Sequence, residues 1–266
     1  MMQNHKEEFE TTTLKISDGV ATVTMNRPEI RNAFDERMIA EVHNSIKAVS
    51  SDNSVRVVII TGAGTAFSAG ADISWMRRMG QSGFEENYQD ALLLAYMFDS
   101  IARCPKPTIA RVNGATIGGG SGLAAACDIA IGDEKAFFSF SEVKIGLVPA
   151  CIGPYVMRKV GQARSRELFI SGRRIYAAEA ERYGLLNFVS EENKLDDDVA
   201  KLTERLISSG PEAIKAAKNL VSDVPDQSRE EFIEYTARMI AELRTSPEGR
   251  EGTTAFLEKR KPNWAD

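Results

Sequence analysis

A run of three glycines in front of an alanine-rich segment constrains this chain more than any other feature. Gly118, Gly119 and Gly120 follow the β-branched segment 107–112 and precede the segment 123–127, which has high helix propensity. Glycine permits positive φ and close backbone approach, so three of them before a helix predict a loop that presents main-chain groups. Unpaired N–H groups at a helix N-terminus attract negative charge. We therefore expect this loop to bind an anionic group.

A carboxylate follows the glycine run. Glu142 lies in Ser-Phe-Ser-Glu-Val, just past the apolar run 136–138, which is typical of a strand. A cradle of donors and a carboxylate, with no metal motif between them, indicate proton transfer beside a stabilised oxyanion. The alternative is that the glycines serve tight helix packing and that Glu142 is a surface carboxylate.

A second loop of small residues follows an apolar strand earlier in the chain. The continuous apolar run 55–60 predicts a strand covered on both faces. It leads into Thr61-Gly-Ala-Gly64 and then into residues 66–73, Ala-Phe-Ser-Ala-Gly-Ala-Asp-Ile. This loop is a second place where backbone N–H groups can face a ligand.

Composition excludes several classes of function. The 266 residues carry a net charge of −5, and no Lys/Arg cluster is present, which argues against nucleic-acid binding. The polar N-terminus and the lack of a long apolar run predict neither a signal peptide nor a membrane span. Three irregularly spaced cysteines fit reduced thiols in the cytoplasm, and two histidines make a structural zinc site improbable.

Strands and helices alternate to about residue 190, which predicts a parallel α/β core. A hairpin is expected over 14–25, and an amphipathic helix over 35–49 buries Met38, Val42, Ile46 and Val49. A helix over 84–103 is expected to turn Leu92, Leu93, Tyr96, Met97 and Ile101 mostly inward, whereas 75–83 lacks periodicity and is expected to be mobile. Shorter elements are predicted at 165–170, 177–183 and 185–189. Four helices follow, over 196–209, 211–222, 227–244 and 247–259, so we divide the chain into a core, 1–195, and a helical oligomerisation region, 196–266.

Taken together, these pieces resemble the crotonase (enoyl-CoA hydratase/isomerase) superfamily over nearly the whole chain. Each motif is weak alone, but the ordered set is specific, and residues 141–150 resemble bacterial methylglutaconyl-CoA hydratase-like members. The matching stretches are Met25-Asn-Arg-Pro28 with Asn32-Ala33, residues 67–73, Val112-Asn-Gly114 with Gly118-Gly-Gly120, Cys127-Asp128, residues 141–149 and residues 255–260.

The resemblance implies an α/β spiral of stacked β-β-α turns followed by a helical trimerisation region, assembled as a homotrimer or a dimer of trimers. It implies that the N–H groups of Ala71 and Gly119 form an oxyanion hole for the thioester carbonyl of an acyl-CoA. It requires no cofactor, because coenzyme A belongs to the substrate. Residues implied to hold coenzyme A are Arg31, Ala69, Asp72 and Ile73, with Phe256 and Lys259 supplied by a neighbouring subunit.

One position departs from the family pattern. Two-glutamate hydratases carry a glutamate just after the triple glycine, where this chain has Gly122; the second glutamate is kept as Glu142. One hypothesis is a hydratase whose branched or carboxylated acyl chain, such as that of 3-methylglutaconyl-CoA, uses the space at Gly122. Another is a Δ3,Δ2-enoyl-CoA isomerase, for which one base suffices. A further crotonase-type lyase, hydrolase or decarboxylase and a non-catalytic acyl-CoA-binding module complete the alternatives.

Overall fold

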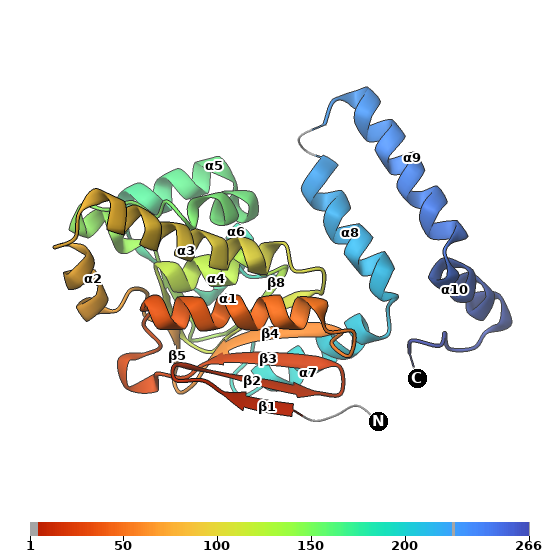
Figure 1. Ribbon diagram of the computed structural model, residues 1–266, viewed down its shortest axis with the longest axis horizontal. Coiled ribbons are helices and arrows are strands. Elements are labelled where there is room, and N and C mark those ends of the chain that lie inside the picture. The colour runs from red at the N-terminus through yellow and green to blue at the C-terminus, as the bar shows by residue number, and fades with distance from the viewer. Residues whose placement is uncertain (1–4, 225–226, 266) are drawn as a thin grey trace.

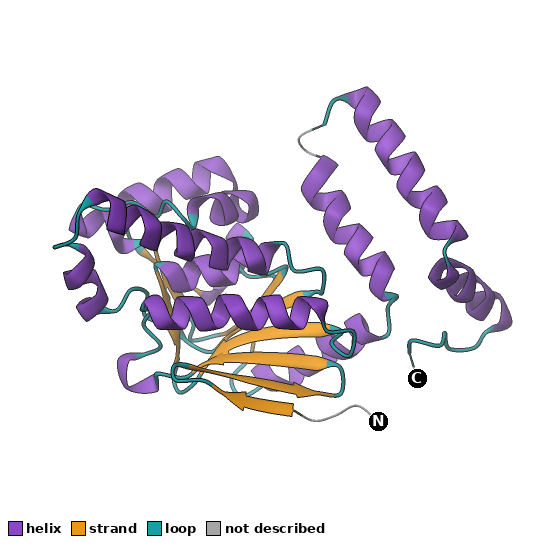
Figure 2. Cartoon of the chain, viewed as in Figure 1, coloured by secondary structure: helices purple, strands orange, loops and turns teal. Residues whose placement is uncertain are grey.

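The long sheet of the protein is mostly parallel and carries two antiparallel strands at one edge (Figures 1 and 2). The computed structural model describes residues 5–224 and 227–265. The strand order is β1-β2-β3-β4-β6-β8-β11, with β3, β4, β6, β8 and β11 parallel. The bounds are β1 His5–Glu8, β2 Thr12–Ser17, β3 Val20–Met25, β4 Val57–Gly62, β6 Thr108–Val112, β8 Ile129–Asp133 and β11 Phe188–Ser190.

A second, shorter sheet lies against the first and makes the chain a spiral. Its order is β10-β9-β7-β5, with bounds β5 Ala66–Ser68, β7 Ala115–Ile117, β9 Phe137–Ser139 and β10 Arg174–Tyr176. Successive turns of the chain place one strand in the long sheet and the next in the short sheet, as β4 and β5, β6 and β7, and β8 and β9 do. Helices then return the chain to the long sheet. This architecture confirms the predicted spiral α/β core.

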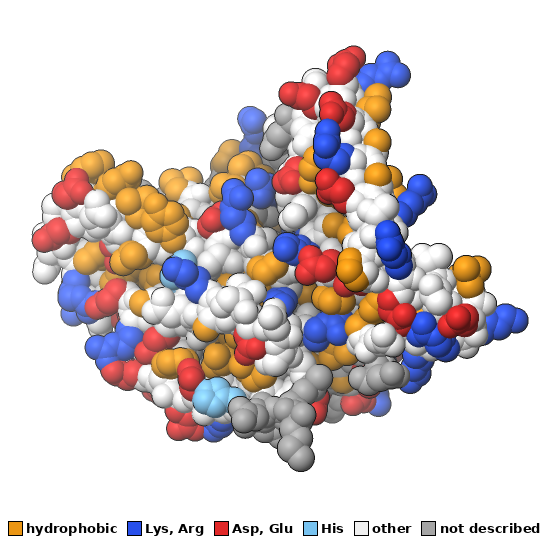
Figure 3. All heavy atoms as spheres, turned by 45° about the vertical axis from the view of Figure 1, so that its right-hand side comes forward, with side chains coloured by type: hydrophobic (Ala, Val, Ile, Leu, Met, Phe, Trp, Pro, Cys, Tyr) orange, Lys and Arg blue, Asp and Glu red, His pale blue; other side chains and the backbone are white. Residues whose placement is uncertain are grey.

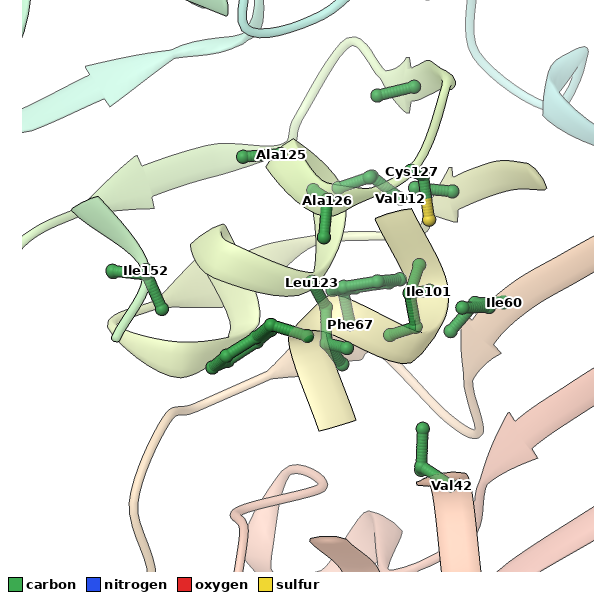
Figure 4. Packing of buried hydrophobic residues seen from close by; sticks show 14 of the residues in the cluster. Val42, Ile60, Phe67, Ile101, Val112, Leu123, Ala125, Ala126, Cys127 and Ile152 are labelled. Atoms are coloured by element: carbon green, nitrogen blue, oxygen red, sulfur yellow. The ribbon is translucent and has the colours of Figure 1, made fainter. Parts of the chain in front are cut away.

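Helices cover both faces of the long sheet. The main apolar core packs α1, α3, α4 and α5 over one face, as the close-up in Figure 4 shows in part. On the other face, Leu195 and Val199 of α7 pack against Val57, Ile109 and Ile131. The bounds are α1 Glu36–Ser51, α2 Ile73–Met79, α3 Phe84–Ala102, α4 Gly119–Ala126, α5 Gly153–Ser171, α6 Ala177–Tyr183 and α7 Leu195–Ile207, with 3-10 turns η1 Pro28–Ile30 and η2 Ser141–Ile145.

Two local expectations need correction. Residues 73–79 form α2, and Trp75 is buried there, so most of the segment expected to be mobile is a short helix. With a single buried side chain, α2 leaves no periodic pattern in the sequence. On α3, Leu93 and Tyr96 are exposed, whereas Met97, Phe98 and Ile101 are buried. The helix at 35–49 is confirmed as α1, which begins after Asp35, whose carboxylate accepts a hydrogen bond from the Met38 N–H.

The last three helices stand away from the sheets (Figure 1), and Figure 3 shows hydrophobic side chains among charged ones on the part of the molecule that projects from the rest. They are α8 Pro211–Asp223, α9 Arg229–Thr245 and α10 Pro247–Glu258. Lys218 of α8 anchors them, because its Nζ lies 2.6 Å from Asp128 Oδ2 and 2.8 Å from the Lys106 carbonyl oxygen. Asp128 also accepts hydrogen bonds from the N–H and Oγ1 of Thr108, so its role here is structural. None of the helices in the described ranges combines the length and apolar character needed to cross a membrane.

Candidate active site

The Ala71 segment is fixed by a short parallel bridge to Phe34. The Phe34 N–H donates to the Gly70 carbonyl oxygen at 2.6 Å, and the Asp72 N–H donates to the Phe34 carbonyl oxygen at 2.7 Å. In such a bridge the two neighbours of Ala71 make the hydrogen bonds, so the N–H of Ala71 itself points away from Phe34. No acceptor for that N–H is found among the described residues, and Ala71 is exposed.

The side chain of Arg27 holds the Ala71 segment in place. Its guanidinium lies 3.1 Å from Asp72 Oδ2 and 2.8 Å from Asp35 Oδ2, and it also donates to the Ala33 carbonyl oxygen. The other carboxylate oxygen of Asp72 accepts from the N–H groups of Ser74 and Trp75 and caps α2. Asp72 is therefore fully engaged within the protein, and the loop around Ala71 is held on both sides.

Gly119 begins α4 and lies beside the Ala71 loop. A Cβ at Gly119 would stand 2.8 Å from Cε2 of Phe34, and a Cβ at Gly70 would stand 3.0 Å from the Ile117 carbonyl oxygen. The ring of Phe34 thus packs against Gly119, while the backbone of Phe34 forms hydrogen bonds with the two neighbours of Ala71. As the first residue of a helix, Gly119 has no intrahelical partner for its N–H, and no other described residue accepts it. Two free N–H donors therefore come from neighbouring loops.

Glu142 lies over the N-terminus of α4. Its Oε1 would be 3.1 Å from a Cβ at Gly118, and Gly118 has φ 52°, which glycine adopts readily. The Gly118 N–H donates to the Ser139 carbonyl oxygen at 2.8 Å, which ties α4 to the end of β9, three residues before Glu142. The structure thus brings Glu142, Gly119 and the Ala71 loop together.

The carboxyl group of Glu142 lacks a hydrogen-bond donor for one of its oxygens among the described residues. Its Oε2 is buried and has no hydrogen bond from the described residues. Burial raises the pKa of Glu142, an effect partly offset by a hydrogen bond from its own backbone. Within the described ranges, no group of three or more His, Cys, Asp or Glu side chains is placed to hold a metal ion. A carboxylate in this state can exchange protons with a bound molecule.

The expected space at Gly122 is filled. A Cβ there would lie 2.1 Å from Cγ2 of Ile152 and 3.2 Å from Cε1 of Phe98. Figure 4 shows Ile152 beside the coil of α4. Gly122 is therefore a packing position, and the room that the sequence analysis expected there for a substrate group does not exist. The correction could not be foreseen, because Ile152 comes thirty positions later in the chain.

Some of the residues expected to hold coenzyme A lie beside the Ala71 loop, and the others lie at the end of α10. The N–H of Ala69 donates to the Arg31 carbonyl oxygen, and the N–H of Asp72 is also taken, so neither N–H is free for a ligand. Ile73 is 76% exposed beside them. Phe256, 82% exposed, and Lys259 lie at the end of α10, far from α2 and α4 in Figure 1. Their supply by a neighbouring subunit stays a prediction.

Sequence reasoning missed Phe34 and Arg27 as organisers of the site. Both belong to or adjoin the stretches quoted for the family resemblance, Met25–Pro28 and Asn32-Ala33. Their role depends on pairings across almost forty positions, such as Phe34 with Ala71, which no local pattern reveals. The hydroxyl of Ser121, within the glycine-rich stretch, is buried and donates to the Thr116 carbonyl oxygen, so it is not available as a nucleophile.

Known proteins are similar to this chain in sequence and in fold. Residues 15–266 match the family model described as enoyl-CoA hydratase/isomerase. The chain belongs to that family. An enoyl-CoA hydratase structure from Shewanella pealeana aligns over 96% of each chain with 36% identity and a TM-score of 0.93.

Curated members of the family agree over similar lengths. The short-chain-enoyl-CoA hydratase of Clostridium acetobutylicum is 32% identical over 96% of this chain and 97% of its own. The mitochondrial enoyl-CoA hydratase of Pongo abelii is 32% identical over 94% of this chain and 85% of its own. The protein is thus an enzyme of the enoyl-CoA hydratase/isomerase family.

Proposed function

We propose that the protein hydrates 2-enoyl-CoA thioesters with Glu142 as its only catalytic carboxylate. One observation carries the proposal. A buried carboxylate oxygen of Glu142, with no hydrogen bond from the described residues, lies near the N–H groups of Ala71 and Gly119, for which no described residue is an acceptor. The names of the similar proteins support the same reaction class. Coenzyme A enters with the substrate, so the reaction needs no separate cofactor.

In this proposal each group has a role. The thioester oxygen accepts hydrogen bonds from Ala71 and Gly119, which stabilise the enolate oxygen that forms as water adds to C3. Each preorganised donor of this kind is worth about 3 kcal/mol in the transition state. Glu142 takes a proton from the attacking water and returns one to C2. The raised pKa of Glu142 serves both steps, because it makes the carboxylate a better base and keeps its acid form within reach.

The acyl chain is less defined. The sequence analysis expected a branched or carboxylated chain, such as that of 3-methylglutaconyl-CoA, because Gly122 seemed to leave room for it. Ile152 and Phe98 fill that position, so this support is lost. A carboxylated ester stays in the test below as a comparison substrate.

Absorbance of the conjugated thioester tests the proposal. Crotonyl-CoA and 3-methylglutaconyl-CoA are expected to lose that absorbance if hydrated. A 3-enoyl-CoA would gain it if the enzyme is an isomerase, a second candidate that the single carboxylate favours. No change with any of these esters, despite measurable binding, would overturn the catalytic proposal and leave an acyl-CoA-binding protein.

A further inference from the structure

A second carboxylate, Asp90, stands close to the chain segments that build the site. Trp75 follows Ala71 by four positions, at the start of α2, and its Nε1–H donates to Asp90 Oδ1 at 3.1 Å. Trp75 is buried, so this hydrogen bond joins α2 to the first half of α3. The segment that carries one oxyanion donor thus runs directly to Asp90.

The segment that carries Glu142 runs to the same place. After η2 the chain reaches Cys151, whose Sγ lies 3.7 Å from the carbonyl oxygen of Ala91, the neighbour of Asp90. The next residue, Ile152, contacts Gly122, which is one turn from Gly119 along α4. The pKa of the Cys151 thiol is raised first by burial and then by the charge of Asp90, in keeping with this proximity. The segments that carry Ala71 and Glu142 therefore both lead to the first half of α3.

The charge of Asp90 has no dedicated counterion. Among the described residues, no Lys, Arg or His nitrogen forms an ion pair with it, and the nearby Arg78 is already paired with Glu36. Trp75 supplies one neutral hydrogen bond to Oδ1 and leaves Oδ2 without a described donor. A partly buried carboxylate without an ion-pair partner repels a second carboxylate that approaches it, although solvent screens part of this repulsion.

We infer that Asp90, held by Trp75, sets the acyl-chain specificity of the enzyme by excluding chains that end in a carboxylate. The substrates it admits are uncharged enoyl chains, and a terminal hydroxyl can donate to Oδ2. This inference rests on the proposed function, since it takes Ala71, Gly119 and Glu142 as the place of the thioester. The sequence alone suggested a carboxylated acyl chain, whereas this inference assigns an uncharged one.

Matched saturated thioesters test the inference through binding, without turnover. Calorimetry on the full chain compares hexanoyl-CoA with adipyl-CoA, and octanoyl-CoA with suberyl-CoA. We expect the neutral ester to bind at least about tenfold more tightly in one or both pairs. Asp90→Asn keeps an acceptor for Trp75 and removes the charge, so it should shrink that ratio about tenfold. Asp90→Ser provides a second variant should the first fail to fold.

Asp99→Asn is the matched control, because Asp99 lies on the same helix and is bonded to Arg103. It should leave the ratio unchanged. An equal ratio in wild type and Asp90→Asn, or the same change in Asp99→Asn, would overturn the inference. Wild-type turnover of crotonyl-CoA, measured in parallel, tests the proposed function separately, so the two failures are distinguishable.

Discussion

At the scale of single residues, the burial of the Glu142 carboxyl group lowers the stability of the fold. A buried polar atom without a hydrogen-bond partner costs about 1–3 kcal/mol. The Oε2 of Glu142 is such an atom, and the raised pKa of its carboxyl group reports the same desolvation. Gly118 contributes by having no side chain, since a Cβ there would crowd Oε1.

Glu142→Gln should therefore stabilise the fold near neutral pH. Because the folded-state pKa of Glu142 is raised, its ionisation lowers stability as pH rises through that pKa. Below the unfolded-state pKa, about 4.3, the penalty is absent. Urea unfolding should show the variant more stable by up to about 1 kcal/mol at pH 8, with little difference near pH 4. A less stable variant at pH 8 would contradict the buried, unpaired carboxylate.

The raised pKa of Glu142 should also appear in the pH dependence of kcat/KM. If Glu142 acts as the base, activity falls as it becomes protonated, so the acidic limb should lie above the ordinary glutamate pKa of 4.5. The measurement is kcat/KM for crotonyl-CoA between pH 4 and 9. An acidic limb at or below 4.5 would remove Glu142 from that role or place it in contact with bulk water.

At the scale of elements, close packing fixes the start of α4. Phe34 backs Gly119, and Ile152 fills the direction of a side chain at Gly122, so α4 is wedged between the Ala71 loop and the start of α5. Apolar packing therefore occupies the position at which the family pattern has a second glutamate. Under the proposed function, Glu142 alone transfers protons there.

Gly122→Ala should destabilise the protein, because overpacking of this kind costs about 1–3 kcal/mol. The same substitution made in an Ile152→Ala background should cost much less, because Cγ2 of Ile152 is then absent. Gly153→Ala is a suitable control, since its Cβ would meet nothing closer than 3.9 Å. Urea unfolding of Gly122→Ala, Ile152→Ala, Gly153→Ala and the double variant measures this. A stable Gly122→Ala, or an equal cost in both backgrounds, would mean that open space does exist at Gly122.

Many of the helices, strands and loops could be predicted from the sequence, and the features that could not be predicted depend on contacts between residues far apart in the chain. The stripe on α1, the hairpin of β2 and β3, and Gly184 at the end of α6 follow from local rules. Glu142 and the two N–H loops were identified from their motifs. The bridge of Phe34 to Ala71 and the packing of Ile152 on Gly122 could not be foreseen, because they join residues at least thirty positions apart.

At the scale of the whole molecule, the C-terminal helices carry exposed apolar side chains. Val221, Ile233, Ile240 and Leu257 are exposed on α8, α9 and α10, and a groove of about 400 Å³ lies between α8 and α9, away from Glu142. Exposed apolar surface of this extent is typical of association surfaces. The homotrimer or dimer of trimers stays a prediction, as does the cytoplasmic location.

Sedimentation velocity should find three or six chains per particle. Phe256→Ala should then raise KM for crotonyl-CoA about tenfold with kcat nearly unchanged, because an aromatic side chain that contacts only the coenzyme A portion contributes uniform binding. Leu257→Ala, adjacent on α10 and also exposed, is the comparison variant. A monomer at micromolar concentration, or an unchanged KM in Phe256→Ala, would contradict the predicted role of a neighbouring subunit.

The turnover of Glu142→Gln tests the central claim most directly. We measure kcat on crotonyl-CoA together with the Kd of butyryl-CoA, using the unfolding transition to confirm the fold. The account predicts that kcat falls at least about a thousandfold while the Kd stays within about tenfold, since the donors of Ala71 and Gly119 are untouched. A variant that binds and turns over like the wild type would show that another group moves the proton.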